Sequence, residues 1–305
     1  MTTKTFTVIG NCQAPCMAHA LLSNPTFREQ YKWHRIPPVH NINLEQISNQ
    51  FEKLREFDLI IYQPVINAAR FGEFEIEHLR KELAGTCDLL CIPSCYFNGY
   101  FPTISTIQGI HTPAHLVSDM AVFHAFDLGI SAQDAAQMIY EAPYLPAQFY
   151  VSAWKQGISE LRDREVLYSV DVSLADFLEA EGRNKVLMHQ FNHPTRAVFD
   201  YLANEICARL GVAGHSATAH DLDPICFPVL PAVKKALGLP QSGSDVLSVN
   251  GKTLELNTFV QGSYAAYENM PAEQRKHCAQ RLPVLRGHIV EYIANHIAFT
   301  TSTPP

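Results

Sequence analysis

The sequence predicts an α/β fold, in which a small parallel sheet in the N-terminal half is embedded in a predominantly helical chain. Two observations predict it. Short apolar or alternating segments are separated by helical periodicities before residue 95, and helical periodicities dominate after residue 115. Strands that alternate with helices pair in parallel through right-handed crossovers. With 305 residues, 47% of them hydrophobic, the chain can build a substantial core.

Four segments are the expected strands of the sheet. Residues 5–10 alternate polar and apolar side chains and end in a glycine turn, and a second strand is expected within residues 31–36. Residues 57–64 and 87–93 are apolar runs ended by proline, which is typical of buried strands. The helices between these strands are expected at residues 14–22, 43–57 and 73–83.

The second half shows mainly helical spacing, at residues 118–128, 131–140, 147–162, 173–181, 195–210 and 272–299. Residues 185–194 interrupt this pattern with an apolar segment that is expected to return a strand to the sheet. Residues 221–263 carry several prolines and glycines and are predicted to be rich in loops. We therefore predict an α/β subdomain over 1–115 and a mainly helical part over 116–305, joined in one compact unit.

Composition excludes several classes of protein. The formal charge of −7 argues against a nucleic-acid partner, because such proteins usually carry a basic excess. No window approaches the roughly 20 apolar residues of a membrane span, and the N-terminus is too weakly apolar for a signal peptide. The eight cysteines are then expected to be reduced thiols in a cytoplasmic protein.

The turn Gly10-Asn11-Cys12-Gln13 follows the first predicted strand and precedes a helix. This places it at the carboxyl edge of a parallel sheet, where α/β proteins bind ligands and where a helix N-terminus lowers a thiol pKa. Cys12 is therefore a candidate nucleophile, with amide donors from Asn11 or Gln13 for an oxyanion. The alternative is that Cys12 and Cys16 are small buried residues.

A nucleophile needs a base, and His193 is the leading candidate among 14 histidines. It follows the apolar segment at 185–189 and stands directly before Pro194, at a strand-to-helix junction like that of Cys12. His189 lies inside the apolar segment and is the second candidate.

The sequence predicts no metal site. Cys87, Cys91 and Cys95 recur every four residues, but a four-residue step along a strand separates two side chains by about 13 Å. Zinc ligands usually stand closer together, with two residues between them.

Two resemblances build on these residues. Gly10-Asn11-Cys12 is similar in type to the Gly-Asp-Ser block of the SGNH hydrolases, and His193-Pro194 resembles their late histidine block. Together with the aromatic segment Tyr96–Pro102, these motifs more closely resemble the WcbI-type polysaccharide-biosynthesis proteins, whose expected activity is acetyl transfer from coenzyme A. The resemblance implies an SGNH- or flavodoxin-like sheet.

The resemblance further implies acetyl transfer from acetyl-CoA to a sugar or polysaccharide precursor of a capsule or exopolysaccharide, in association with other biosynthetic enzymes. Cys12 would be the nucleophile or line the acyl site, His193 the base and Asn98 an oxyanion donor. Gly10 and Asn11 would line the cofactor site. Cationic donors for the CoA phosphates are expected from Arg196, in the first turn of a helix, and from Arg70.

One departure from the SGNH pattern concerns the partner of His193. The hydrolases carry an aspartate three residues before the histidine, whereas this chain has Gln190. Asp119, Asp221 and Asp223 are possible substitutes. Transfer through acetyl-Cys12 and direct transfer both remain open, as do a carbohydrate esterase and a non-catalytic CoA- or nucleotide-sugar-binding protein.

Overall fold

The computed structural model describes residues 3–141, 144–219, 225–240 and 246–296. The chain forms two compact units, each built from three separate stretches. Unit 1 consists of Met1–Phe97, Ile158–Gly182 and Leu187–Leu222, and unit 2 of Asn98–Gly157, Arg183–Val186 and Asp223–Pro305. Residue 115 therefore lies inside unit 2, and the predicted division into 1–115 and 116–305 stays a prediction.

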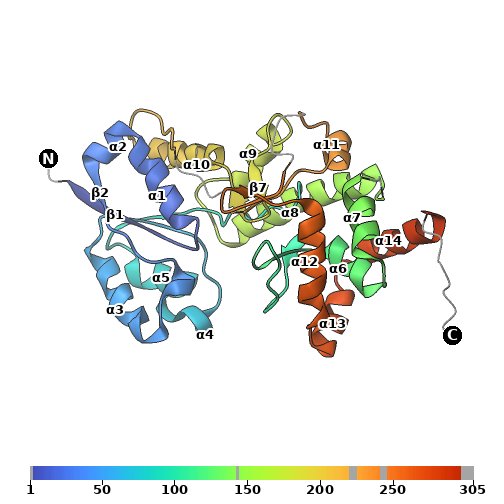
Figure 1. The fold of residues 1–305 in the computed structure, drawn as a ribbon. Coiled ribbons are helices and arrows are strands. Elements are labelled where there is room, and N and C mark those ends of the chain that lie inside the picture. The colour runs from blue at the N-terminus through green and yellow to red at the C-terminus, as the bar shows by residue number, and fades with distance from the viewer. Residues whose placement is uncertain (1–2, 142–143, 220–224, 241–245, 297–305) are drawn as a thin grey trace, which may run out of the picture. The chain divides into compact units, whose positions relative to one another are not determined.

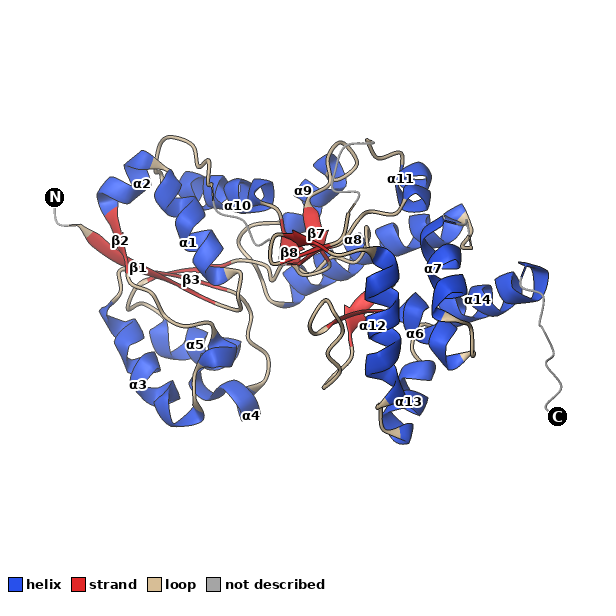
Figure 2. Cartoon of the chain, viewed as in Figure 1, coloured by secondary structure: helices blue, strands red, loops and turns tan. Residues whose placement is uncertain are grey.

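The sheet of unit 1 has four parallel strands in the order β2-β1-β3-β4 (Figure 2). They are β1 Lys4–Ile9, β2 Tyr31–Trp33, β3 Leu59–Tyr62 and β4 Asp88–Cys91, at the four predicted positions. Because β2 lies on one side of β1 and β3 on the other, the order reverses between β1 and β3, which is where open α/β sheets bind ligands. The predicted α/β class with a small parallel sheet is confirmed.

Helices cover both faces of this sheet, with α1 and α10 on one and α3, α4 and α5 on the other (Figure 1). On the second face, Ile60 and Tyr62 of β3 pack in a buried cluster with Phe51 of α3 and Leu79 of α5. Unit 1 contains the helices α1 Ala14–Ser23, α2 Pro25–Gln30, α3 Ile47–Glu52, α4 Ala68–Phe71, α5 Ile76–Leu83, α9 Leu174–Glu181 and α10 Arg196–Arg209, and the short 3₁₀ turns η1 Val39–Asn41, η2 Leu44–Gln46, η3 Lys53–Glu56 and η4 Gly72–Phe74.

Residues 185–194 do not return a strand to the sheet, which corrects the prediction. Instead β7 (Met188–Gln190) pairs antiparallel with β8 (His193–Pro194) in a separate hairpin of unit 1. The physical reason is local. The chain reverses over the two residues Phe191 and Asn192, so β7 finds its partner at once, and a proline in β8 offers no N–H to a longer ladder.

Unit 2 is mainly helical and contains two small antiparallel sheets. One joins β5 Ile104–Thr106 to β6 Val117–Asp119, and the other joins β9 Ile225–Cys226, β10 Ser248–Val249 and β11 Lys252–Thr253. Its helices are α6 Met120–Asp127, α7 Ala132–Glu141, α11 Pro231–Leu237, α12 Leu256–Glu268, α13 Ala272–Ala279 and α14 Pro283–His296. The helix α8 (Ala147–Leu167) begins in unit 2 and ends in unit 1.

The predicted loop-rich stretch 221–263 is wrong where α12 begins at Leu256. Phe259, Ser263 and Tyr267 are spaced by one helical turn and are buried, but the preceding prolines and glycines obscured this pattern. Gly262 allows close packing, because a Cβ there would lie 2.3 Å from Cγ of Pro113. Residues 272–299, predicted as a helix or a helix pair, form the pair α13 and α14, and the last of these residues lie outside the described ones. None of the helices in the described part of the chain combines the length and the apolar composition that a membrane span requires.

Candidate active site at the carboxyl edge of the sheet

The turn Gly10–Gln13 connects β1 to α1 at the carboxyl edge of the sheet. The backbone N–H of Gln13 donates to Oδ1 of Asn11 over 2.8 Å, and the N–H of Ala14 donates to the Asn11 carbonyl over 3.1 Å. These bonds close the turn around Cys12, whose side chain is half-buried. Cys12 therefore stands two residues before the first residue of α1.

Glycine is required at position 10 because the side chain of Gln63 lies directly against it, at the point where the strand order reverses. The side chain of Gln63, which follows β3, accepts a hydrogen bond from the Asn11 N–H at 3.0 Å. A Cβ on Gly10 would lie 2.3 Å from the same Gln63 Oε1, a distance that real Cβ contacts do not reach. A larger residue at position 10 would therefore displace Gln63 from the turn.

Gln13 is buried, and its side-chain amide is fully hydrogen-bonded. Its Nε2 donates to the carbonyls of Cys95, at 3.2 Å, and Asn192, at 2.8 Å. Its Oε1 accepts from Nε2 of Gln63, at 2.7 Å, and from the Cys95 N–H, at 3.0 Å. No amide hydrogen of Gln13 is left for an oxyanion, so the donor role predicted for this side chain is wrong. Gln13 instead lies in the segment after β1 and hydrogen-bonds to three others: the segment after β3, the segment after β4, and the β7–β8 hairpin.

This contact brings the segment of His193 to the turn of Cys12. The carbonyl that accepts from Gln13 belongs to Asn192, the residue directly before His193. His193 lies in β8 opposite Gln190 of β7, and only 9% of it is exposed. A single hydrogen bond of 2.8 Å, from Gln13 to Asn192, thus joins the residue after Cys12 to the residue before His193. His189, the second candidate base, lies in β7 and is half-buried.

The environment of Cys12 does not lower its pKa, which corrects another expectation. Burial raises the pKa of the Cys12 thiol, and a backbone hydrogen bond opposes this effect only in part. The loss of solvent is therefore the larger of the two influences on this thiol. The thiol is protonated at neutral pH and requires a base before it can act as a nucleophile.

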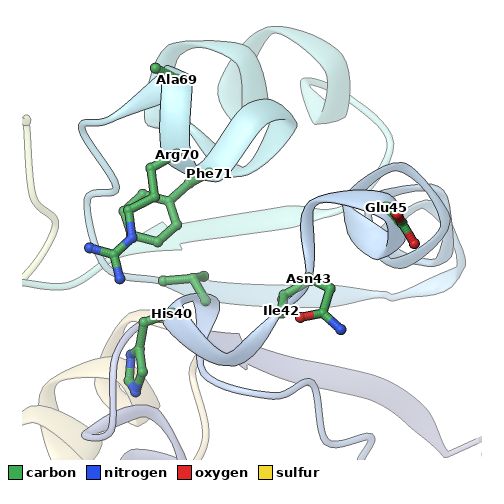
Figure 3. A pocket seen from close by; sticks show the side chains of 8 residues that line it. His40, Ile42, Asn43, Glu45, Ala69, Arg70 and Phe71 are labelled. Carbon is green, nitrogen blue, oxygen red and sulfur yellow. The ribbon is translucent and has the colours of Figure 1, made fainter.

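An open cleft of about 750 Å³ lies beside this turn, between the segments that follow β2 and β3. The two regions are joined directly, because the N–H of Val39, a lining residue, donates to the Gly10 carbonyl over 2.9 Å. The Arg70 guanidinium lies 5.1 Å from the ring centre of Phe71. Burial and the charge of Arg70 lower the pKa of His40, which lies on the opposing segment, at the same end of the cleft as the Arg70 side chain (Figure 3).

Comparison with known proteins places this chain in a family. A family model described as the polysaccharide biosynthesis enzyme WcbI matches residues 5–215, which is more than half of the chain. The chain belongs to the WcbI family. The match includes the turn of Cys12, the cleft and the hairpin of His193.

A solved structure of a WcbI protein has the same fold. It matches with a TM-score of 0.84 and 22% sequence identity, over 95% of this chain and 99% of that one. It is described as a novel polysaccharide biosynthesis enzyme, in a native form without a disulfide bond between coenzyme A and one of its cysteines. A search of curated proteins gave no match.

The other predicted site residues of this WcbI-family chain lie in different places. Arg196 is the first residue of α10, exposed, and forms no ion pair with the described residues. Asn98 belongs to unit 2, where its carbonyl accepts from the N–H of Phe101 over 2.9 Å, and its role as an oxyanion donor stays a prediction. Asp119 is also in unit 2, and both Asp221 and Asp223 lie outside the described residues.

Sequence reasoning missed two residues of the candidate site, Gln63 and His40. A signal was present for each, because Gln63 follows a buried strand directly and His40 lies in the loop after β2, at the same edge of the sheet. Among the described residues, no three His, Cys, Asp or Glu side chains come together as a possible metal site.

Proposed function

We propose that this chain binds acetyl-CoA in the cleft beside the Gly10–Gln13 turn and transfers the acetyl group to a sugar hydroxyl of a capsular or exopolysaccharide precursor. Cys12 is the nucleophile and His193 the base. Membership of the WcbI family and the description of its relative, which names both polysaccharide biosynthesis and coenzyme A, support the class of reaction.

The observation that carries the proposal is the hydrogen bond from Gln13 to the Asn192 carbonyl, at 2.8 Å. It holds the residue after Cys12 against the residue before His193, although 179 positions separate them in sequence. A nucleophile and its base need their two segments to be held together in this way, because proton transfer requires the two side chains to come within hydrogen-bond reach.

Because the pKa of the Cys12 thiol is raised, the thiol needs a base to remove its proton, and His193 is the base in this proposal. His193 takes the thiol proton, the Cys12 sulfur attacks the thioester carbonyl, and the bond between the acetyl carbon and the CoA sulfur breaks. The departing CoA thiolate takes that proton from His193. In the second half, His193 takes the proton of the sugar hydroxyl and the sugar oxygen attacks the carbonyl of acetyl-Cys12. The bond between the acetyl carbon and the Cys12 sulfur breaks, and the released Cys12 thiolate takes the proton from His193. One thioester replaces another, so the intermediate is energetically accessible.

Asn11 takes the oxyanion role that Gln13 cannot fill. Its Oδ1 is bound to the Gln13 N–H, whereas its Nδ2 donates to no described residue. An amide donor on the residue before the nucleophile is well placed to stabilise the negative charge of the tetrahedral intermediate.

Arg70 and Arg196 supply charge for the CoA phosphates. Neither guanidinium is paired with a carboxylate among the described residues, and both are exposed on unit 1. Arg70 lines the cleft beside the Phe71 ring, a surface on which an adenine can pack.

Intact-protein mass spectrometry after incubation with acetyl-CoA tests the proposal. We expect the protein to gain the mass of one acetyl group, and Cys12→Ser to lose this gain. His193→Asn should form the adduct at least tenfold more slowly, in line with the usual contribution of a general base. Cys16→Ser is the matched control, since it removes a half-buried thiol one helical turn away.

Other results would identify one of the alternative functions or contradict the proposal. Sugar acetylation that persists in Cys12→Ser would indicate direct transfer from bound acetyl-CoA. Release of acetate from an acetylated sugar without CoA would indicate an esterase. A melting temperature unchanged by millimolar CoA would contradict the transferase altogether, because a ligand that binds only the folded state must raise it.

A further inference from the structure

The cleft beside the Gly10–Gln13 turn is divided in its charge. Among the described residues that line it, three side chains can carry a charge: His40, Glu45 and Arg70. His40 and Arg70 lie at one end of the cleft, on opposing segments, whereas Glu45 lies at the other end (Figure 3). One end therefore carries two positive charges whenever His40 is protonated, and the acidic side chain of the lining is directed elsewhere.

Arg70 supplies a permanent positive charge to this end. Its side chain is exposed, its guanidinium carbon lies 5.1 Å from the ring centre of Phe71, and it forms no ion pair with the described residues. A guanidinium without a carboxylate partner keeps its N–H donors for an anion, and it matches the geometry of a phosphate group through two parallel hydrogen bonds.

His40 lies in the field of Arg70 and has no acidic group to oppose it. Burial and the charge of Arg70 are the two influences on the pKa of His40 from the described residues, and both lower it. At pH 7 the ring is therefore mostly uncharged. An anion in contact with both side chains reverses this balance, because it offsets the charge of Arg70 and favours the protonated ring. The anion and the proton then each strengthen the binding of the other.

We propose that His40 binds a phosphate group of CoA together with Arg70, and that it does so as an imidazolium, so that CoA and a proton bind together. The inference rests on the proposed function, because that function places CoA in this cleft. A ring N–H of His40 donates to a phosphate oxygen, and the proton that charges the ring comes from the solvent. Glu45 repels the phosphate at the far end, which orients the ligand. The group is the ribose 3′-phosphate or the pyrophosphate, which offer the same acceptor oxygens.

Calorimetric titration of the full chain with CoA at pH 7 tests the uptake of a proton. The titration is run in PIPES and in Tris, which absorb different amounts of heat when they release a proton, so the difference in binding enthalpy gives the number of protons taken up. We expect roughly half a proton per CoA for the unmodified chain and less than about 0.1 for His40→Gln. His34→Gln is the matched control and should behave like the unmodified chain, since His34 is exposed and does not line the cleft.

A second variant separates charge from shape. His40→Lys keeps a positive charge at every pH used, so it should bind CoA more tightly than His40→Gln at pH 8 and take up no proton. Between pH 8 and pH 6.5, Kd for CoA should fall about threefold in the unmodified chain and by less than about 1.5-fold in both variants. Dephospho-CoA distinguishes the two phosphate sources. Proton uptake that disappears with this ligand assigns the 3′-phosphate to His40, and uptake that persists assigns the pyrophosphate.

Equal proton uptake by the unmodified chain and His40→Gln would overturn the role of His40 and leave the transferase function untouched. His40→Lys that binds CoA no better than His40→Gln at pH 8 would likewise overturn it, because the charge of this side chain would then not matter. If the unmodified chain does not bind CoA at all, both the inference and the proposed function are wrong.

Discussion

Gln13 and Gln63 join the ends of β1 and β3 through a buried hydrogen bond of 2.7 Å, which Nε2 of Gln63 donates to Oε1 of Gln13. Gln13→Met keeps most of the side-chain volume but removes all four bonds of this amide and leaves their partners buried. We expect a loss of about 3 kcal/mol in the free energy of unfolding, from urea denaturation. Gln30→Met, on the exposed end of α2, should change it by less than about 0.5 kcal/mol. Equal values for the two variants would contradict the role of Gln13.

Gly10 and Gln63 should be energetically coupled. Gly10→Ala places a Cβ 2.3 Å from Gln63 Oε1, so we expect a loss of roughly 2 kcal/mol in the free energy of unfolding. In a Gln63→Ala background the added methyl meets no amide, and its cost should fall by at least about 1 kcal/mol. Gly287→Ala in α14, where nothing lies within 4 Å of the new Cβ, should stabilise the protein slightly. A double-mutant cycle that is additive would show that the close approach is not limiting.

Arg70 should contribute to CoA affinity without contributing to the fold. Arg70→Met removes one charge-assisted contact to a phosphate, and we expect Kd for CoA to rise about 10- to 100-fold in calorimetric titration. The rise should shrink in high salt, since exposed charges are screened. Arg28→Met removes an exposed cation of α2 outside the cleft and should leave Kd within about twofold. If both variants bind CoA alike, the phosphates bind elsewhere.

His124 should make the protein less stable as the pH falls. It is fully buried, with Nε2 2.9 Å from the Arg281 carbonyl and Nδ1 3.4 Å from a guanidinium nitrogen of Arg286. Burial, helped by the charge of Arg286, lowers the pKa of His124 to about 4. The histidine pKa in the unfolded chain is about 6.5. At a pH between the folded and unfolded pKa values, the unfolded chain therefore binds a proton at this histidine and the folded chain does not.

From pH 7 to pH 5, this histidine alone should cost about 2 kcal/mol in the free energy of unfolding, as measured by urea denaturation at the two pH values. His124→Gln keeps a hydrogen-bonding side chain but does not titrate, so the difference between the two pH values should shrink by about that amount. An unchanged difference would mean that other groups set the acid stability.

The sheet could be predicted from the sequence because its strands are short, apolar and separated by helical stretches. Leu59–Tyr62 is buried throughout, and a run of this kind followed by proline has few other structures open to it. Residues 185–194 could not be placed in the same way. A single apolar segment does not reveal whether its partner is the main sheet or the next few residues, and the two-residue turn decided in favour of the hairpin.

The positions of the candidate site residues in the fold could be predicted from the sequence, but their contacts could not. Cys12 and His193 stand at junctions between secondary-structure elements, where short motifs carry information about position. The partners of Gln13, however, are 50, 82 and 179 residues away in sequence. The direction of the pKa shift of Cys12 likewise depends on how deeply distant segments cover the thiol, which no local pattern contains.

The two units have a consequence for how this chain is made. Unit 1 is complete only when residue 222 has been synthesised, although its sheet lies within the first 97 residues. The whole first stretch of unit 2, Asn98–Gly157, is synthesised after the sheet but before α10 and the hairpin that bonds to Gln13. A single cut anywhere in the chain would divide at least one unit, so neither half can be released intact by removing one end.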